Sequence, residues 1–313
     1  MKRALHAIVL SSLLLPQTQL IAEDDYYLDN PKSRKVLERI IDDATDRKYD
    51  YISQSINKKM AEDMTECVYQ VVHEFRYEKI TYTYGKDGKA SEKKEPYAHT
   101  INGSCVLIKK SRKEKKLLFL TAKHLVNNPT PPEPNDATGR PLVRYKLVSS
   151  HPKVVLFKTE YPIQIVMWKE LRAVASSPNA DLSLLEGDVA SEKELNSYKV
   201  SPPLGNSDEL AFGHIIYTVG FSFAITKVLG EGRVSSPGDP GLVFDDTEFH
   251  TYSLTNFGNS GGAAYAIRDG HPELVGIASR KRKDAEGLNL YVRINHAKAL
   301  LKDTHVPAYF REK

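Results

Sequence analysis

Short β-rich segments separated by turn signals occupy most of the chain after residue 65, and they restrict the folds that it can adopt. The stretches 67–77, 215–220 and 290–294 concentrate Val, Ile, Tyr and Phe, residue types that are favoured in strands. Their spacing is typical of all-β barrels or sandwiches. Strands and helices do not alternate here, which argues against a parallel α/β sheet. The sequence therefore predicts an all-β fold.

The β-rich region divides into two halves. The segments 103–108 and 116–122 are predicted as strands that pair in a hairpin, because a basic loop separates them. The segment 191–208 is polar and contains two prolines, so it is the predicted boundary. We expect a first half over residues 64–200 and a second half over residues 201–313.

Helices are predicted near the two ends of this region. In residues 23–63, apolar side chains between Val36 and Ile41 recur at helical spacing. This segment is expected to be either a helical hairpin packed on the main domain or a pro-segment or regulatory arm. Near the other end, a helix is predicted to begin at Asn295, which provides an N-cap for an apolar face.

The first 22 residues have the layout of a cleaved signal peptide. Lys2 and Arg3 precede an apolar run over residues 4–15, and Ala22 precedes an acidic stretch. The alternative is an uncleaved membrane anchor, but spanning a bilayer takes about 20 apolar residues. No later segment is long and apolar enough to cross a membrane. We therefore expect an exported protein, periplasmic or secreted, without a membrane span after removal of residues 1–22.

Charge and cysteine content exclude some classes of partner. The formal charge is +4 and falls to +2 without Lys2 and Arg3, which gives little reason to expect nucleic acid as a partner. The two cysteines, Cys67 and Cys105, are too few for a four-cysteine zinc site. They either form one disulfide or remain separate buried thiols. No metal and no cofactor is expected.

Three local motifs carry candidate chemistry. His124 follows the predicted strand at 116–122, Asp181 opens a strand, and Ser260 lies among glycines that include Gly258 and Gly262. Each motif alone is weak, since a lone histidine or a glycine-rich turn is usually structural. Glycines nevertheless let the backbone adopt left-handed conformations and let a substrate approach closely.

Together, the three motifs follow one of the known chain orders of a catalytic triad. Ser260 would attack a scissile carbonyl, His124 would take and later return the proton, and Asp181 would orient the imidazole. The backbone N–H groups of Gly258 and Ser260 would donate to the oxyanion. We expect a chain of hydrogen bonds from carboxylate through ring to hydroxyl.

These residues resemble the trypsin-like (chymotrypsin-fold) serine peptidases, in their HtrA/Deg-type branch. The segments Thr121–His124, Asp181–Leu185 and Gly258–Gly262 are similar to the motifs of that branch, and the likeness spans about 103–301. The resemblance implies two six-stranded antiparallel β-barrels, with an N-terminal helical extension and a C-terminal helix. It places His124 and Asp181 on the first barrel and Ser260 on the second, in the cleft between them.

The resemblance also implies a substrate pocket. Leu254 and Thr255 would lie near its base, with Ala278 and Ser279 on its wall. No acidic residue is among them, so we expect small or medium apolar side chains rather than Lys or Arg. The basic run 280–283 would either favour acidic flanking residues or form a solvated loop.

Two departures from the pattern change what is expected. Asn259 stands where digestive members have Asp, so activation by a newly cut N-terminus that pairs with that Asp is not expected. The residues before Lys313 leave no room for the PDZ domain of typical HtrA proteins, so PDZ-based regulation is not expected either.

The expected function is that of an exported serine endopeptidase acting on protein or peptide substrates. One rival is a catalytically inactive binding protein with the same fold. Another is an α/β-hydrolase esterase, because residues 258–262 also fit a Gly-x-Ser-x-Gly elbow. That rival would need Asp284 with His296 or His305 after Ser260.

Overall fold

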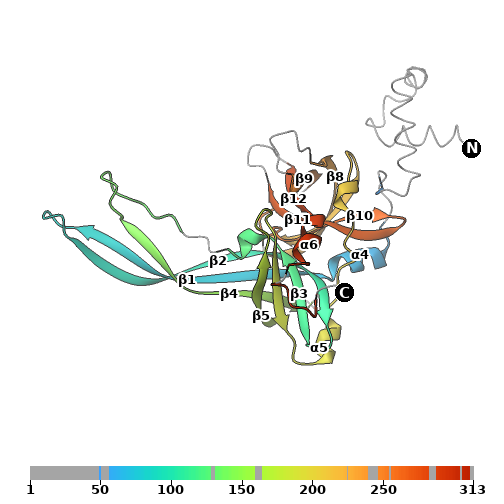
Figure 1. The fold of residues 1–313 in the computed structure, drawn as a ribbon, viewed down its shortest axis with the longest axis horizontal. Coiled ribbons are helices and arrows are strands. Elements are labelled where there is room, and N and C mark those ends of the chain that lie inside the picture. Colours follow the sequence, from blue (N-terminus) through green and yellow to red (C-terminus); the bar gives the residue numbers. More distant parts are fainter. Residues whose placement is uncertain are drawn as a thin grey trace, which may run out of the picture.

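The computed structural model of the chain contains two β-barrels side by side (Figure 1). Both barrels are closed, six-stranded and antiparallel, which confirms the predicted fold class. Residues 1–22 and most of 23–63, including the predicted helical face at 36–41, lie outside the described residues. The structure describes residues 49–50, 56–127, 131–158, 164–223, 225–238, 246–253, 255–281, 287–303 and 305–310.

The first barrel has the strand order β1-β2-β3-β6-β5-β4. Each strand pairs antiparallel with its neighbours in that order. Its strands are β1 (Val68–Tyr84), β2 (Ala90–Ser111), β3 (Lys116–Thr121), β4 (Val143–Lys158), β5 (Gln164–Ser176) and β6 (Ser183–Asp188).

The second barrel has the order β10-β11-β12-β9-β8-β7. Its strands are β7 (Ile215–Ser222), β8 (Thr226–Ser236), β9 (Glu248–Ser253), β10 (Ala263–Arg268), β11 (His271–Lys281) and β12 (Leu288–Arg293). The predicted boundary after residue 200 falls in the connection between β6 and β7.

Short helices border the barrels. The predicted helix near Asn295 is present as α6, but its N-cap is Arg293, and Asn295 lies within the helix. Part of the helical segment predicted before residue 64 is present as α4, which Asn57 caps by accepting from the Met60 backbone N–H. The helices are α4 (Lys58–Thr65), α5 (Glu192–Ser197) and α6 (Ile294–Leu300), with 3₁₀ turns η1 (Lys123–Leu125) and η2 (Ser207–Glu209).

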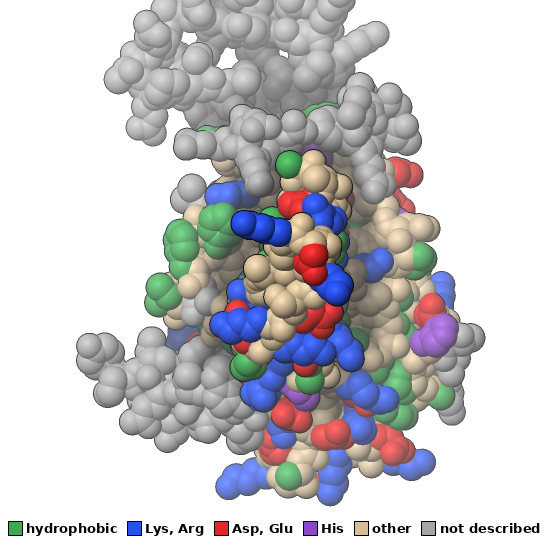
Figure 2. Space-filling model, turned by 90° about the vertical axis from the view of Figure 1, so that its left-hand side faces the viewer, with side chains coloured by type: hydrophobic (Ala, Val, Ile, Leu, Met, Phe, Trp, Pro, Cys, Tyr) green, Lys and Arg blue, Asp and Glu red, His purple; other side chains and the backbone are tan. Residues whose placement is uncertain are grey.

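A three-stranded arm formed by the outer parts of β1, β2 and β4 projects from the first barrel (Figure 1). The sequence predicts a strand only from residue 103, but β2 begins at Ala90 and pairs with β1 as far as Tyr84. Tyr77 of β1 lies opposite Tyr97 of β2, and their ring centroids are 6.2 Å apart. Such cross-strand pairs stabilise β2, whose charged composition does not by itself indicate a strand. Figure 2 shows the mixed acidic and basic side chains that cover this side of the molecule.

Successive side chains of one strand point to opposite sides. One set packs inside a barrel, and the other set packs between the two barrels. On β3, Leu117 and Phe119 pack inside the first barrel, while Leu118 and Leu120 face the second barrel. On β10, Ala264 lies inside the second barrel. This alternation follows from the two-residue period of a strand. Both faces of such a strand are buried, so it forms a continuous apolar run.

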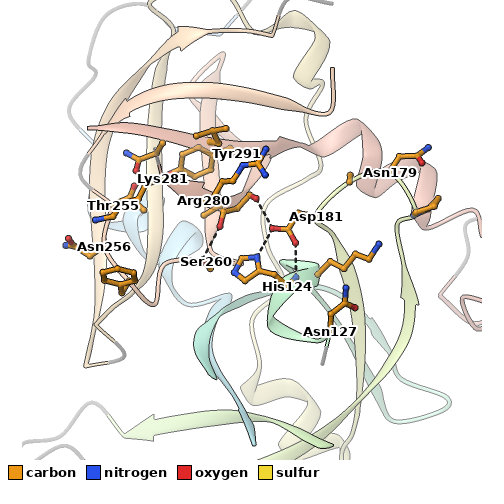
Figure 3. A pocket seen from close by; sticks show the side chains of 18 residues that line it. His124, Asn127, Asn179, Asp181, Thr255, Asn256, Ser260, Arg280, Lys281 and Tyr291 are labelled. Atoms are coloured by element: carbon orange, nitrogen blue, oxygen red, sulfur yellow. Dashed lines mark hydrogen bonds and ion pairs between the residues drawn. The ribbon is translucent and has the colours of Figure 1, made fainter. Parts of the chain in front are cut away.

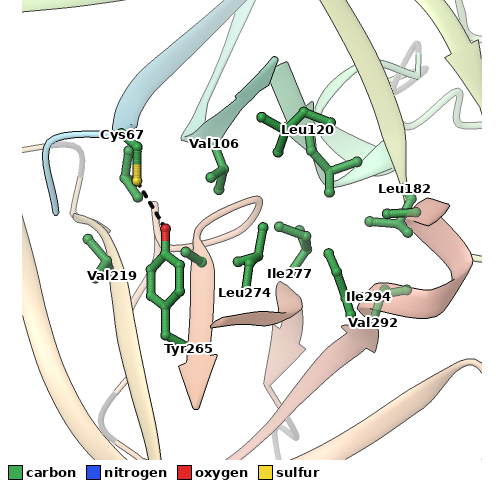
Figure 4. Close-up of a cluster of buried hydrophobic side chains, with 14 of the residues drawn as sticks. Cys67, Val106, Leu120, Leu182, Val219, Tyr265, Leu274, Ile277, Val292 and Ile294 are labelled. Carbon is green, nitrogen blue, oxygen red and sulfur yellow. Dashed lines mark hydrogen bonds between the residues drawn. The ribbon is translucent and has the colours of Figure 1, made fainter. Parts of the chain in front are cut away.

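The cluster between the barrels joins them into one body (Figure 4). Each large apolar side chain removed from water contributes about 1.5–3 kcal/mol, so the cluster opposes separation of the barrels. Its labelled members are Cys67, Val106, Leu120 and Leu182 from the first-barrel side, and Val219, Tyr265, Leu274, Ile277, Val292 and Ile294 from the second-barrel side.

Asp50 bridges β10 and β7 of the second barrel, and Tyr49 packs in the core of that barrel. The Asp50 N–H donates to the Ile267 carbonyl at 3.0 Å, and the Ile215 N–H donates to the Asp50 carbonyl at 2.9 Å. Tyr49 is 1% exposed within the barrel core, and its hydroxyl donates to Glu273 at 2.8 Å. This short stretch is therefore part of the barrel.

Cys67 and Cys105 are free and buried, so the structure contains the second of the two predicted alternatives. Cys67 packs between the barrels, whereas Cys105 packs inside the first. Burial raises the pKa of the Cys67 thiol to about 11, which makes it unreactive near neutral pH. Within the described residues, no helix combines the length and the apolar character needed to cross a bilayer.

Candidate active site

The pairing of β3 with β6 brings His124 and Asp181 together. Thr121, the last residue of β3, lies opposite Ser183, the first residue of β6. His124 follows β3 on η1, and Asp181 precedes β6. Two residues 57 positions apart in the chain therefore meet because antiparallel neighbours place the end of one strand beside the start of the other.

Both carboxylate oxygens of Asp181 contact His124 (Figure 3). Oδ2 lies 2.7 Å from His124 Nδ1, and Oδ1 accepts the His124 backbone N–H at 2.8 Å. The Nδ1 contact fixes the ring orientation and favours the tautomer with a proton on Nδ1. Nε2 is then left to act as a base.

Asp181 accepts a third hydrogen bond, from a residue other than His124, and the sequence did not indicate this contact. The Ser279 hydroxyl donates to Asp181 Oδ2 at 2.7 Å. Burial alone would raise the pKa of Asp181, but the hydrogen bonds from His124 and Ser279 hold that pKa below its ordinary value. A depressed pKa keeps the carboxylate ionised throughout the neutral and mildly acidic range. Ser279 therefore does more than line a pocket wall.

Ser260 lies in the same cavity as His124 and Asp181. This cavity has a volume of about 730 Å³. Its hydroxyl donates to the Ser279 carbonyl at 3.1 Å. Within the described part of the chain, no hydrogen bond joins Ser260 to His124. Only the carboxylate-to-ring part of the expected chain is therefore formed, because the single hydroxyl proton is used by the Ser279 carbonyl.

Glycines shape the loop that carries Ser260. Gly258 and Gly261 have φ angles of 92° and 80°, in the left-handed region that favours glycine. A Cβ on Gly261 would lie 2.0 Å from the Ser104 carbonyl oxygen. Among the described residues, no acceptor engages the backbone N–H of Gly258 or of Ser260. Both N–H groups can therefore donate to an oxyanion, which is the role predicted for them from the sequence.

Asn259, which stands in place of an acid, is 8% exposed. Its Oδ1 accepts the Ser222 hydroxyl at 3.3 Å. The buried Asn259 side chain therefore has a neutral hydrogen-bonding partner, the hydroxyl of Ser222 on β7.

Three of the four predicted pocket residues, Thr255, Ala278 and Ser279, line the cavity. Leu254 lies outside the described residues. The Thr255 hydroxyl is 3.1 Å from the Tyr291 hydroxyl, so the cavity wall includes a polar group of β12. Sequence reasoning missed Tyr291, because neither its position nor its neighbours mark it as part of a site.

No group of three or more His, Cys, Asp or Glu side chains within the described residues is arranged to hold a metal ion. The two-barrel fold is also not that of an α/β-hydrolase. Asp284 lies outside the described residues.

The fold and the site define a two-barrel protein with an Asp–His pair beside a serine on a glycine-shaped loop. A family model for the trypsin-like peptidase domain matches residues 103–277, which is more than half of the 313 residues. The chain belongs to the trypsin-like peptidase family.

The chain is also similar in part to a periplasmic member of this family. The chain is 30% identical over 110 residues to the periplasmic serine endoprotease DegP of Salmonella typhimurium. That match covers 34% of this chain and 21% of DegP, so the chain spans about a fifth of that relative.

Two structures of the HtrA-type protease AlgW resemble the fold, each with a TM-score of 0.50 at 17% identity. One was solved with a decapeptide, and the other is a variant with a tripeptide. The matches cover 78% and 81% of this chain, and 66% and 64% of the AlgW chains. At this identity the likeness concerns the fold alone.

Proposed function

We propose that this protein is an exported serine endopeptidase, with Ser260 as nucleophile, His124 as general base and acid, and Asp181 as the group that orients His124. The observation that carries the proposal is the bidentate contact of Asp181 with the side chain and backbone of His124, in one cavity with Ser260. Membership of the trypsin-like peptidase family supports the same chemistry.

The first step requires the Ser260 hydroxyl to leave the Ser279 carbonyl. Rotation about the Cα–Cβ bond would turn Oγ toward His124 Nε2, and catalytic hydrogen bonds commonly tighten only when substrate binds. Oγ then attacks the scissile carbonyl while Nε2 takes its proton. Asp181, ionised and already bonded to Nδ1, stabilises the imidazolium that forms.

The tetrahedral oxyanion would accept from the backbone N–H groups of Gly258 and Ser260. Each such donor contributes about 2.7–4 kcal/mol to transition-state stabilisation. Collapse of the intermediate transfers the proton from Nε2 to the leaving amine and leaves an ester on Ser260. Water, deprotonated by His124, then hydrolyses that ester.

Export and a peptide substrate are supported by different observations. Lys2 and Arg3 followed by the apolar run 4–15 form a signal-peptide pattern, and the DegP relative is named as periplasmic. The AlgW structures contain peptides, and Ser260 lines a cavity of about 730 Å³ in this chain. We therefore propose unfolded protein as the substrate, outside the cytoplasm.

The rival function is that of an inactive binding protein, which is favoured by the hydrogen bond from Ser260 to the Ser279 carbonyl. A fluorophosphonate probe separates the two functions, because it labels only an activated serine. We expect the purified protein to be labelled on Ser260 and to hydrolyse casein.

The Ser260→Ala variant should lose labelling and hydrolysis while its thermal unfolding is unchanged. His296→Ala and His305→Ala serve as controls and should be labelled like the wild type. Full casein hydrolysis by Ser260→Ala would remove Ser260 from the mechanism, and an unlabelled wild type would favour the binding protein.

A further inference from the structure

The side of the cavity that receives the acyl residue follows from the position of His124. The leaving amine must lie next to His124, which gives it a proton. The residue before the scissile bond therefore enters the part of the cavity that lies away from His124. That part is lined by second-barrel residues, among them Thr255, Phe257, Lys281 and Tyr291.

Positively charged side chains outnumber carboxylates around the whole cavity. The described charged residues that line the cavity are Lys123, Arg280 and Lys281 against the single carboxylate Asp181, in addition to His124. Arg280 is paired with Glu248, a buried carboxylate behind the cavity, at 2.9 Å. Asp181 is engaged by His124 and by a serine hydroxyl.

Lys281 has no carboxylate partner within the described part of the chain. Its Nζ lies 4.9 Å from the centre of the ring of Phe257, another residue that lines the cavity. A cation–π contact of this kind holds the ammonium in place without using its hydrogen-bond donors.

We propose that Lys281 selects substrates with an acidic residue immediately before the scissile bond. This inference rests on the proposed function. A glutamate side chain that reaches Lys281 would pair with its ammonium, whereas a lysine side chain would be repelled by it. The preference differs from the small or medium apolar residues expected from sequence, because the sequence did not show that Lys281 enters the cavity.

Matched peptides test this preference. Cleavage sites in casein are first mapped by mass spectrometry. A peptide spanning the best site is then made with Glu, Gln or Lys before the cleaved bond. We expect kcat/KM to be about tenfold higher for Glu than for Gln, which corresponds to about 1.4 kcal/mol, and lowest for Lys. The preference should weaken at high salt.

Variants assign the preference to one side chain. Lys281→Gln should abolish the preference for Glu over Gln, and Lys281→Glu should reverse the order of Glu and Lys. Lys89→Gln, a matched change at an exposed lysine of the arm, should leave the ratio unchanged. Equal rates for Glu and Gln in the wild type would overturn the inference.

Binding separates this inference from the proposed function. Fluorescence anisotropy with the Ser260→Ala protein measures peptide affinity without turnover. Tighter binding of the Glu peptide, lost in the Lys281→Gln, Ser260→Ala double variant, would support the site even if the wild type were inactive. Equal affinities for Glu and Gln would contradict it.

A second, independent observation concerns Ser104, which is fully buried on β2. Its hydroxyl donates to the Gly258 carbonyl at 2.8 Å and accepts the Phe221 N–H at 2.9 Å. Its backbone N–H donates to the Ser260 carbonyl at 2.7 Å, and its carbonyl accepts the Thr121 hydroxyl at 2.7 Å.

These bonds tie the nucleophile loop of the second barrel to two strands of the first. Ser104 holds the Gly258 carbonyl and the Ser260 carbonyl, so it restricts the backbone path of the loop that carries both proposed oxyanion donors. Thr121 ends the strand that precedes His124. We infer that Ser104 is a positioning residue that aligns the oxyanion donors with the base on the other barrel.

Ser104→Ala should lower kcat about tenfold and change KM less than twofold, because misplaced oxyanion donors weaken transition-state binding alone. The affinity for a peptide boronate should fall by the same factor as kcat. Ser207→Ala, which removes another fully buried serine hydroxyl that accepts the Asn295 N–H, is the stability control and should keep kcat. A Ser104→Ala protein that retains kcat while the wild type is labelled by the probe would overturn this inference and leave the proposed function intact.

Discussion

The two barrels have the same number of strands, but the strands of the first barrel include much longer ones. In the first barrel, β1, β2 and β4 are 17, 22 and 16 residues long. No strand of the second barrel exceeds 11 residues. The additional length of the first barrel projects as the arm, whereas in the second barrel Asp50 bridges β7 and β10. The arm is an addition to its barrel, and the candidate site residues lie instead at the ends of β3 and β6 and on the loop before β10.

The largest effect on casein hydrolysis is expected when either barrel loses the side chain that it contributes to the candidate triad. His124→Ala in the first barrel and Ser260→Ala in the second should each reduce casein hydrolysis by about 10⁴–10⁶-fold, because triad members act as a unit. The double variant should be no slower than the worse single variant, as measured by initial rates. Losses that multiply would mean that the barrels act independently.

The second barrel should depend on Tyr49 for its stability. Tyr49→Ala removes a buried ring and should lower the free energy of unfolding by about 3 kcal/mol. Tyr49→Phe removes only the hydroxyl and its bonds to Glu273 and the Asn206 N–H, so about 1 kcal/mol is expected. Guanidinium unfolding measures both values. Unchanged stability of Tyr49→Ala would show that the barrel does not need this residue.

The stability of the first barrel should depend on the buried carboxylate of Glu186. Glu186 accepts from Arg172 at 2.6 Å and from the Tyr309 hydroxyl at 2.5 Å. Burial alone would raise the pKa of Glu186, but these hydrogen bonds and Lys116 hold it below its ordinary value. Glu186→Gln should therefore cost about 2 kcal/mol at pH 7.

The pH dependence of this difference has a definite sign. A folded-state pKa below the unfolded value stabilises the protein above the unfolded pKa, and this contribution is lost as the pH falls through the folded pKa. The difference between wild type and Glu186→Gln should thus be full above about pH 5 and shrink below about pH 4. Urea unfolding at a series of pH values tests this, and a difference that is constant down to about pH 2 would contradict it.

The smallest effect is expected at the tip of the arm. Gly88 has a φ of 76°, so Gly88→Ala introduces strain of about 1 kcal/mol. Because the tip is remote from both barrel cores, casein hydrolysis should stay within twofold of wild type and the melting temperature should change by only a few degrees. A large loss of hydrolysis would show that the arm takes part in substrate handling.

The sequence predicted a strand-rich fold and three candidate site residues, and its family resemblance implied the two barrels, but nothing in it indicated the arm. Strand composition at 67–77 and 215–220 and the motifs around His124, Asp181 and Ser260 are local patterns, so they are visible in one dimension. The charged stretch 90–102 becomes a strand because β1 lies beside it, and such pairing is not a property of its own composition.

The sequence by itself determined the strand-forming segments and the glycines around Ser260, because residue period and backbone freedom are local properties. The tertiary structure decided the order of the strands in each barrel and which groups meet. It brought Ser279 to Asp181, Ser104 to the nucleophile loop and Lys281 to Phe257. These contacts join residues from different strands, and only the closure of two barrels against each other sets the distances between them.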